Sequence, residues 1–199
     1  DKVLHFAAQA GVRYSLKNPS EYIKSNQIGF FNIIDLSKIY KTKHFIYASS
    51  SSVYGDNSKL PFSENSNTDQ PRQIYAATKK SNELMAYSYS SLYNLKTTGL
   101  RFFTVYGEWG RPDMAMFIFT DCIKNEKPIK VFNNGEMKRD FTYIDDIVSG
   151  IRESINKNFD CEVFNLGNNK SEKLMDMISI IENELGRKAE IDFLPMQPG

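Results

Sequence analysis

Two side chains in the middle of the chain could together remove a proton from an alcohol. Tyr75 and Lys79 lie four residues apart and open a helical pattern that runs over residues 75–93. This spacing places the phenol and the ammonium on one helix face. A nearby ammonium favours the phenolate, and oxidation of an alcohol requires a base for the hydroxyl proton. The same spacing is common on solvated helices, so the interpretation depends on the rest of the chain.

Serine hydroxyls follow a buried-strand pattern earlier in the chain. The apolar run at residues 44–48 continues directly into Ser49, Ser50, Ser51 and Ser52. Hydroxyls at the carboxyl end of a buried strand lie where open α/β sheets bind their ligands. A flexible serine loop is the alternative, but the ordered-looking stretch that follows at residues 53–55 favours a ligand-binding turn.

The elements around these residues alternate between strands and helices. Strands are predicted at residues 3–8, 44–48 and 97–107, and helices at 20–40 and 75–93, with a surface loop at 56–72. This order predicts an α/β fold with a Rossmann-like, doubly wound parallel sheet. Right-handed crossovers would bring the strand ends to one rim, so Ala7, Ser50 and Thr104 are expected to face one crevice. Asn26 interrupts an apolar helix pattern, either as a solvated residue or as a buried polar one.

The pattern changes after residue 107. A helix is predicted at 117–124, a strand at 129–132, a helix ending near 155, a strand at 162–167 and a last helix ending at 185. Asn133, Asn134 and Gly135 predict a hairpin-type turn. Asp145 and Asp146 are predicted to cap the helix that ends near residue 155, and Ser171 the last helix.

Composition excludes several classes of partner. The net charge is +1 and the charged fraction is 25%, so neither nucleic acid nor an anionic membrane is an expected partner. Two isolated cysteines (Cys122 and Cys161) and two histidines give no metal-site spacing, so no metal is predicted. No apolar run approaches the roughly 20 residues of a membrane span, and no signal peptide is recognised. A cytoplasmic location is the expectation, and a chain that enters a strand at once is expected to be part of a longer protein.

Five blocks of sequence resemble the extended short-chain dehydrogenase/reductase family, also described as NAD-dependent epimerases and dehydratases. Within it they are most similar to the nucleotide-sugar epimerases that act on UDP-glucuronate. The blocks are HFAAQAGVRYSLKNP, YASSSSVYG, YAATKKSNELMA, LRFFTVYGEWGRPDMA and KRDFTYIDDI. The family opens with a glycine-rich turn before a helix whose N-terminus holds the NAD pyrophosphate. That motif does not occur in this sequence, so the resemblance implies a further mononucleotide-binding half upstream of Asp1.

The resemblance also implies roles for individual residues. Tyr75 would be the catalytic base, Lys79 its activator, and Ser50 the hydroxyl that binds the reacting oxygen. The NAD cofactor would be lined by Phe6, Ala7, Ala8, Asn26, Tyr75, Lys79 and Phe103. The UDP-sugar would contact Ser50, Ser51, Ser52, Tyr75, Thr104, Arg111, Val131, Phe132 and Arg139. Among these, Arg139 would bind the diphosphate, and Val131 and Phe132 would lie near the uracil. Residues 1–106 would form part of the NAD-binding domain and 107–199 mainly a substrate-binding region, with 140–168 returning a helix and a strand to the Rossmann sheet.

The implied reaction is epimerisation at carbon four through a 4-keto intermediate. Related dehydratases carry an Asp-Glu pair after the hydroxyl residue and the related decarboxylase a glutamate, whereas this chain has Ser51 and Ser52. A 4-keto uronic acid is a β-keto acid that can lose carbon dioxide, so its carboxylate must be held. Arg111 offers a charged partner, and Thr104, Ser51 and Ser52 offer hydroxyls. Alternatively, Arg111 is a solvated loop residue and Arg139 belongs to a surface ion pair.

Two other functions remain open from the sequence. The sugar could be a neutral UDP-hexose or a UDP-N-acetylhexosamine. The chain could also bind a nucleotide sugar without chemistry, or act as a dimerising scaffold. The family resemblance further implies a homodimer formed through the helices at 20–40 and 75–93.

Overall fold

The computed structural model describes residues 1–56 and 60–196 of the 199-residue chain, which form two compact units. The first unit contains residues Asp1–Phe103 and Ile147–Leu166, and the second contains Thr104–Asp146 and residues 167–196. Residues 57–59 of the predicted surface loop lie outside the described residues. The functional division predicted near residue 106 stays a prediction.

A four-stranded parallel sheet forms the centre of the first unit. Its strands are β1 (Lys2–His5), β2 (His44–Ser50), β3 (Thr97–Phe102) and β8 (Cys161–Leu166), in the order β1-β2-β3-β8. The register pairs Ser50 of β2 with Phe102 of β3, so both strands end at the same level. The predicted α/β fold with a parallel sheet is confirmed.

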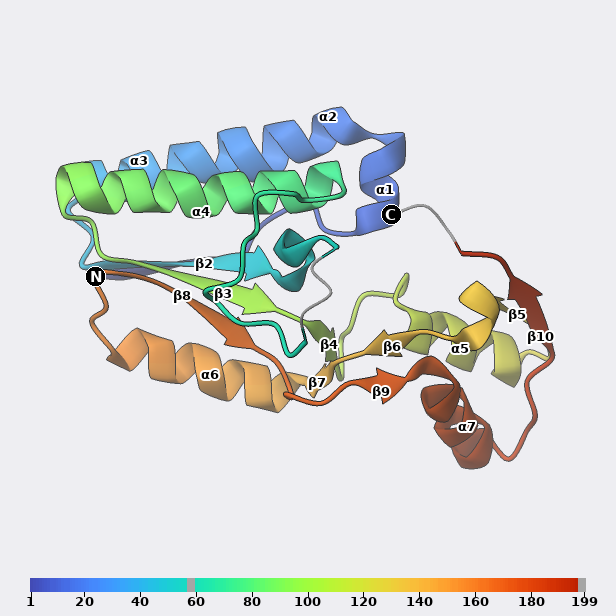
Figure 1. Ribbon diagram of the computed structural model, residues 1–199. Helices are drawn as coiled ribbons and strands as arrows, with labels where there is room; N and C mark the ends of the chain where they lie inside the picture. Colours follow the sequence, from blue (N-terminus) through green and yellow to red (C-terminus); the bar gives the residue numbers. More distant parts are fainter. Residues whose placement is uncertain (57–59, 197–199) are drawn as a thin grey trace. The chain divides into compact units, whose positions relative to one another are not determined.

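Helices cover both faces of this sheet (Figure 1). The helix α3 (Gly29–Ile39) and the long helix α4 (Ile74–Tyr93) run side by side on one face. The helix α6 (Ile144–Asn156) lies on the other face, where Gly150 packs closely against Leu166 of β8. The buried residues between the sheet and its helices are Phe30, Ile34, Phe45, Tyr47, Ala86 and Leu95.

The predicted helix at residues 20–40 is one run with an irregular centre. The short α1 (Val12–Lys17) precedes it, and the run consists of α2 (Pro19–Tyr22), the π-helical segment η1 (Ile23–Ile28) and α3. A π-helical turn inside a helix is frequent at functional sites. Here it contains Asn26, whose side chain is buried.

Two predicted strands are shorter than expected. The first ends at His5 rather than residue 8, so Phe6, Ala7 and Ala8 form a loop beyond the sheet. The strand predicted at 97–107 divides at Phe103 into β3 and β4 (Thr104–Tyr106). The strand divides because its two parts have different partners. β3 pairs with β2 and β8, whereas β4 pairs with β7 (Phe141–Tyr143) in the second unit.

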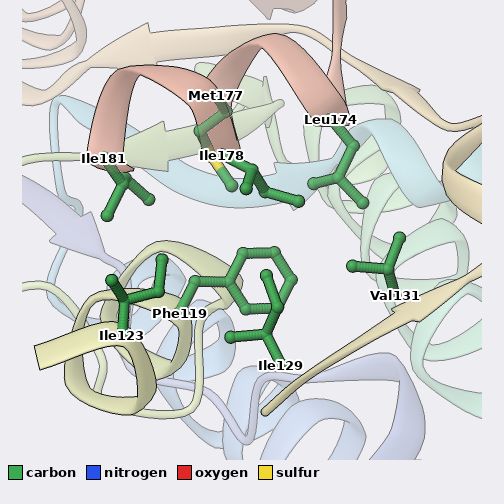
Figure 2. Close-up of a cluster of buried hydrophobic side chains, with 8 residues drawn as sticks. All are labelled: Phe119, Ile123, Ile129, Val131, Leu174, Met177, Ile178 and Ile181. Atoms are coloured by element: carbon green, nitrogen blue, oxygen red, sulfur yellow. The ribbon is translucent and has the colours of Figure 1, made fainter. Parts of the chain in front are cut away.

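The second unit is built around a small apolar core. The helix α5 (Ala115–Lys124) and the strand β5 (Ile129–Phe132) pack against α7 (Leu174–Leu185), as Figure 2 shows. The strand β10 (Ile191–Leu194), which was not predicted, pairs in parallel with β5. The buried residues of this core are Phe119, Ile123, Ile129, Val131, Leu174, Met177, Ile178 and Ile181.

Three predicted turns and caps in the later part of the chain are wrong. Residues Asn133–Gly135 form the short 3-10 segment η3 rather than a hairpin, since β5 pairs with β10 and not with the strand that follows. That strand, β6 (Lys138–Arg139), pairs with β9 (Glu172–Lys173). The pairing delays the start of α7, so Lys173 and not Ser171 is its N-cap. Asp145 and Asp146 lie within the first turn of α6, where carboxylates still favour the positive end of the helix dipole.

Candidate active site

The candidate site of the first unit lies where its parallel strands end. The loop from Phe6 to Ala8 follows β1, and Phe103 follows β3. The turn Ser51–Tyr54, called the serine turn below, follows β2. Because the strands are parallel and adjacent, these segments emerge at one edge of the sheet. The rings of Phe6 and Phe102 meet edge to face with centroids 5.8 Å apart, which joins the first of these ends to the third.

The helix α4 brings the predicted base and its activator to this edge. Tyr75 is partly buried, and its ring packs edge-on against the ring of Tyr22 at 6.0 Å. Lys79, one turn later, is only 4% exposed, and its Nζ donates a hydrogen bond to the carbonyl oxygen of Ala48 at 2.8 Å. Ala48 lies two residues before Ser50 on β2. The structure therefore fixes the Lys79 ammonium at the end of the strand that carries the predicted hydroxyl.

Burial controls the ionisation of Lys79. Removal from water lowers the pKa of its ammonium from 10.5 to about 8. The pKa of His5, at the end of β1, is also lowered, first by burial and second by the charge on Lys79. These shifts describe a cation held in a poorly solvated place, where its electric field acts more strongly on neighbouring groups than it would in water.

Ser50 begins the turn that closes the strand end. It is 8% exposed and is the N-cap of the 3-10 segment η2 (Ser51–Tyr54). Its Oγ accepts a hydrogen bond from the backbone N–H of Ser52 and lies 3.2 Å from the Ser52 Oγ. The helix α4 contacts both β2 and η2, so the serine turn and the helix of Tyr75 and Lys79 lie together. The alternative of a flexible serine loop is wrong.

Asn26 supports the loop after β1. Its side chain is 1% exposed, and its Oδ1 accepts a hydrogen bond from the Gln9 backbone N–H at 2.7 Å. Its Nδ2 donates to the Gln9 carbonyl at 3.0 Å and to Thr78 Oγ1 of α4 at 3.1 Å. One amide therefore joins the π-helical segment, the loop and the helix of the predicted base. The alternative of a solvated asparagine is wrong.

A buried polar network beside the site was missed by the sequence interpretation. It links Ser49, Glu83 and Arg101 through hydrogen bonds and continues to Tyr54 and Asn165. Two signals in the sequence point to it. Glu83 lies eight residues after Tyr75 on the same helix, and Arg101 stands between Leu100 and Phe102 in a strand that must be buried.

The remaining predicted substrate contacts belong to the second unit. Val131 is fully buried in the core shown in Figure 2, so its side chain supports the unit, and Phe132 is partly exposed. Arg111 is exposed, and its Nε donates to Asp113 Oδ1 at 2.6 Å. Arg139 is an exposed residue of β6, and Thr104 begins β4 with its N–H on the Asp140 carbonyl at 3.1 Å. The roles of these residues stay predictions.

The described residues were also compared with the requirements of a metal site, a membrane span and a disulfide. Within residues 1–56 and 60–196, no group of three or more His, Cys, Asp or Glu side chains could hold a metal ion. In the same part of the chain, no helix is both long enough and apolar enough to cross a membrane. Cys122 and Cys161 are free thiols, one in each unit.

Known proteins resemble the chain along most of its length. Residues 1–167 match the NAD dependent epimerase/dehydratase family. A probable UDP-glucuronate 4-epimerase of Rhizobium meliloti is 45% identical over 216 residues, covering 99% of this chain and 63% of that protein. A UDP-glucuronic acid 4-epimerase from Bacillus cereus, solved with UDP-glucuronic acid and NAD, is 35% identical with a TM-score of 0.94, covering 100% of this chain and 64% of that one. A UDP-N-acetylglucosamine 4-epimerase from Methanobrevibacter ruminantium M1, solved with UDP-N-acetylmuramic acid, is 30% identical with a TM-score of 0.93, covering 100% and 65%. The chain thus spans less than two thirds of the length of each of these proteins.

Proposed function

Because the chain belongs to the NAD dependent epimerase/dehydratase family, as its sequence motifs predicted, we propose that the protein is an NAD-dependent 4-epimerase of UDP-glucuronate. The observation that carries the proposal is the position of Lys79. Its ammonium is buried four residues after Tyr75 and bound to the strand that ends at Ser50. This arrangement supplies a base, a cation that supports its ionised form, and a hydroxyl for the sugar oxygen.

In the proposed reaction, the proton moves through Tyr75. The Tyr75 phenolate takes the proton of the sugar 4-hydroxyl while the Ser50 hydroxyl binds the same oxygen. The buried Lys79 ammonium favours the phenolate, because an adjacent positive charge stabilises the ionised form of an acid. When the sugar is re-formed, Tyr75 returns the proton to the oxygen of carbon four. No net proton or hydride is consumed over the cycle.

The first unit offers residues that fit the nicotinamide end of NAD. Ala7 and Ala8 have small, exposed side chains beyond β1, and Asn26 fixes the backbone of the same loop at Gln9. Phe6, Phe103 and the Lys79 ammonium complete the proposed contacts. Bound NAD would supply the acceptor for the hydride of sugar carbon four and the hydride donor for the opposite face of the ketone. Small side chains matter here because they allow a ligand to approach the backbone closely.

The proposed reaction type rests on the serine turn, and the choice of a uronic acid rests on Arg111 and Thr104. Ser51 and Ser52 stand where a dehydratase or decarboxylase would need carboxylates, so the proposed chemistry stops at epimerisation. Arg111, with Thr104, is the proposed partner of the substrate carboxylate. Arg139 is proposed for the diphosphate, and the Phe132 side chain with the backbone of Val131 for the uracil, since the Val131 side chain is buried in the core. The UDP-glucuronate 4-epimerases among the similar proteins support this choice.

A UDP-N-acetylhexosamine or a neutral UDP-hexose is the second candidate substrate. It is favoured by the Arg111–Asp113 ion pair, in which the Arg111 Nε that could bind a uronate already donates to Asp113 at 2.6 Å. The similar UDP-N-acetylglucosamine 4-epimerase of Methanobrevibacter ruminantium M1 supports the same alternative. The remaining possibility is that the chain binds nucleotide sugars without converting them. An assay must therefore distinguish binding from conversion.

Product analysis of the full-length protein tests the proposal. Incubation with UDP-glucuronate should yield UDP-galacturonate, identified by the anomeric and H4 proton signals in NMR, without a net change in NADH absorbance. A pentose product would show decarboxylation instead and contradict the proposal. Conversion of UDP-glucose or UDP-N-acetylglucosamine alone would establish the second candidate, and binding without conversion would establish the third.

We also propose that two copies associate through α3 and α4. These helices are tied to each other by the Tyr89 hydroxyl, which donates to Asp35 Oδ1 at 3.0 Å. Their outer surfaces carry large exposed apolar side chains, which mark interaction sites when they gather on one surface. They include Phe31 and Ile39 on α3, and Leu84, Tyr87 and Leu92 on α4.

A further inference from the structure

A charged pair is buried directly behind the serine turn. Arg101 donates to both carboxylate oxygens of Glu83, from Nε to Oε1 and from Nη2 to Oε2, each at 2.9 Å. The two side chains are only 4% and 5% exposed. Apolar residues of similar volume hold a helix on a sheet as well as a buried ion pair does, because desolvation of the charges offsets their attraction. A role beyond packing would explain the presence of the pair.

The Glu83 carboxylate of this pair contacts the residue before Ser50. Ser49 Oγ donates to Glu83 Oε1 at 2.6 Å, and the preceding residue, Ala48, accepts the hydrogen bond from Lys79 at 2.8 Å. Consecutive residues of β2 are therefore bound by consecutive turns of α4. The helix cannot slide along the strand or rotate against it without breaking both hydrogen bonds.

The Arg101 guanidinium of this pair contacts the turn after Ser50. Arg101 Nη1 donates to the Tyr54 hydroxyl at 2.9 Å, and the guanidinium lies over the Tyr54 ring at 4.9 Å. The Tyr54 hydroxyl in turn donates to Asn165 Oδ1 of β8 at 2.7 Å. Tyr54 ends the turn that begins immediately after Ser50. The same ion pair thus holds Ser50 from both sides.

We infer that Glu83 and Ser49 are positioning residues for the reaction. Through Ser49, Glu83 fixes α4 in the register that holds Lys79 on Ala48, two residues before Ser50, with Tyr75 one turn earlier on the same helix. Through Arg101 it fixes the serine turn. Neither residue needs to touch the sugar. The catalytic consequence rests on the proposed function, whereas the consequence for the position of Lys79 does not. Small displacements of aligned groups have large kinetic effects, on the order of 100-fold for 1 Å.

Ser49→Ala in the full-length protein isolates this effect, because it removes one hydrogen bond and leaves the Glu83–Arg101 pair in place. The matched control is Ser37→Ala on α3, which removes a buried serine hydroxyl bound to the Ile33 carbonyl at 2.7 Å and away from the site. We expect kcat of Ser49→Ala to fall at least about tenfold with little change in KM. Hydride transfer should then limit the rate, so the isotope effect on kcat with sugar deuterated at carbon four should increase. Ser49→Thr, which keeps the hydroxyl, should recover most of the activity.

A second measurement does not depend on turnover. The pKa of Lys79, followed by NMR of the labelled ammonium, should rise in Ser49→Ala from about 8 toward 10.5 as the released helix end admits water. Ser37→Ala should leave it unchanged. If Ser49→Ala matches Ser37→Ala in both kcat and the Lys79 pKa, the inference is overturned. If the wild-type protein epimerises no UDP-sugar, the proposed function fails, and the Lys79 titration alone decides the inference.

Discussion

The Lys79 ammonium donates a hydrogen bond to the carbonyl oxygen of Ala48 at 2.8 Å, which anchors it two residues before Ser50. This contact joins the helix of the proposed base to the strand of the proposed hydroxyl. It also explains how a lysine can be nearly fully buried, since one of its three donors is satisfied by the backbone of the sheet.

Replacement of Tyr75 by phenylalanine should remove the base and keep the fold. The aromatic ring that packs against Tyr22 is retained, so the thermal unfolding midpoint should change little. The kcat of the full-length protein with UDP-glucuronate should fall by a factor of about 10³, the usual range for loss of a general base. Tyr40→Phe, at a tyrosine that is 78% exposed, is the control and should keep full activity. Equal kcat values for the two variants would exclude Tyr75 as the base.

The stability cost of burying Lys79 should depend on pH. Its pKa is about 8 in the folded chain and near 10.5 when unfolded, so between these values the unfolded state binds more protons and stability rises with pH. Below about pH 8 both states are charged and the cost is present in full. Lys79→Met removes this cost. The free energy of unfolding of the Lys79→Met variant minus that of the wild type should therefore decrease by about 3 kcal/mol as the pH rises from about 8 to 10.5.

Urea unfolding of both proteins at several pH values measures this difference. The exposed residue Lys157 provides the control, and Lys157→Met should show a constant difference from wild type over the same range. A constant difference for Lys79→Met as well would mean that the buried lysine carries no desolvation cost.

Loss of the Asn26 amide should loosen the loop after β1. Asn26→Ala removes three hydrogen bonds and leaves the Gln9 backbone groups without their partner. We expect a loss of about 2 kcal/mol in the free energy of unfolding, because partly buried polar groups are left unsatisfied. NAD should also bind the full-length variant more weakly in calorimetry. Asn183→Ala, at an exposed position of α7, should change stability by less than about 0.5 kcal/mol. An Asn26→Ala protein as stable as this control would contradict the supporting role.

Arg111 separates the two candidate substrates. If it binds the uronate carboxylate, Arg111→Ala should lower kcat/KM for UDP-glucuronate by about tenfold to 100-fold, the value of a charged hydrogen bond. The kcat/KM for UDP-glucose should change much less. Arg187→Ala breaks a comparable exposed pair, Arg187 with Glu126 at 3.1 Å, and serves as the control. Equal losses for the charged and neutral sugars would remove the argument for a uronic acid.

Charge on the outer face of α4 should dissociate the proposed dimer. Leu84 and Tyr87 are 57% and 64% exposed and lie one helical turn apart. The double substitution Leu84→Glu and Tyr87→Glu should convert the full-length protein from dimer to monomer in sedimentation velocity. Ile180→Glu on α7, at a residue 61% exposed, should leave the assembly unchanged. A monomeric wild-type protein, or a double variant that remains dimeric, would contradict this interface.

The helix and the strand end of the candidate site that the sequence predicted correctly depend on local order. The helix of Tyr75 and Lys79 follows from its apolar periodicity, and the position of Ser50 follows from a strand that runs into a turn. The Glu83–Arg101 pair was missed because charged residues in a helix and near the end of a strand usually face water. Only the packing of α4 on β3 shows that these two are buried together.

Non-local pairing explains the errors in the second unit. Asn133 and Asn134 have the composition of a hairpin turn, but the partner of β5 is β10, at the far end of the chain. Ser171 has the composition of a helix cap, but the next two residues pair with β6 and displace the start of α7. In both cases the local signal was a reasonable one, and a strand distant in sequence determined the result.

The buried bond between Glu83 and Arg101 also limits how this protein can change over generations. Loss of Glu83 leaves the buried Arg101 guanidinium without its carboxylate, and loss of Arg101 leaves Glu83 with the more distant Lys80 ammonium at 3.8 Å; either change should cost more than loss of both charges. Substitutions at the two positions should therefore occur together, with both charged residues replaced by neutral ones. Across descendants of a common ancestor, residues 83 and 101 are expected to vary as one unit.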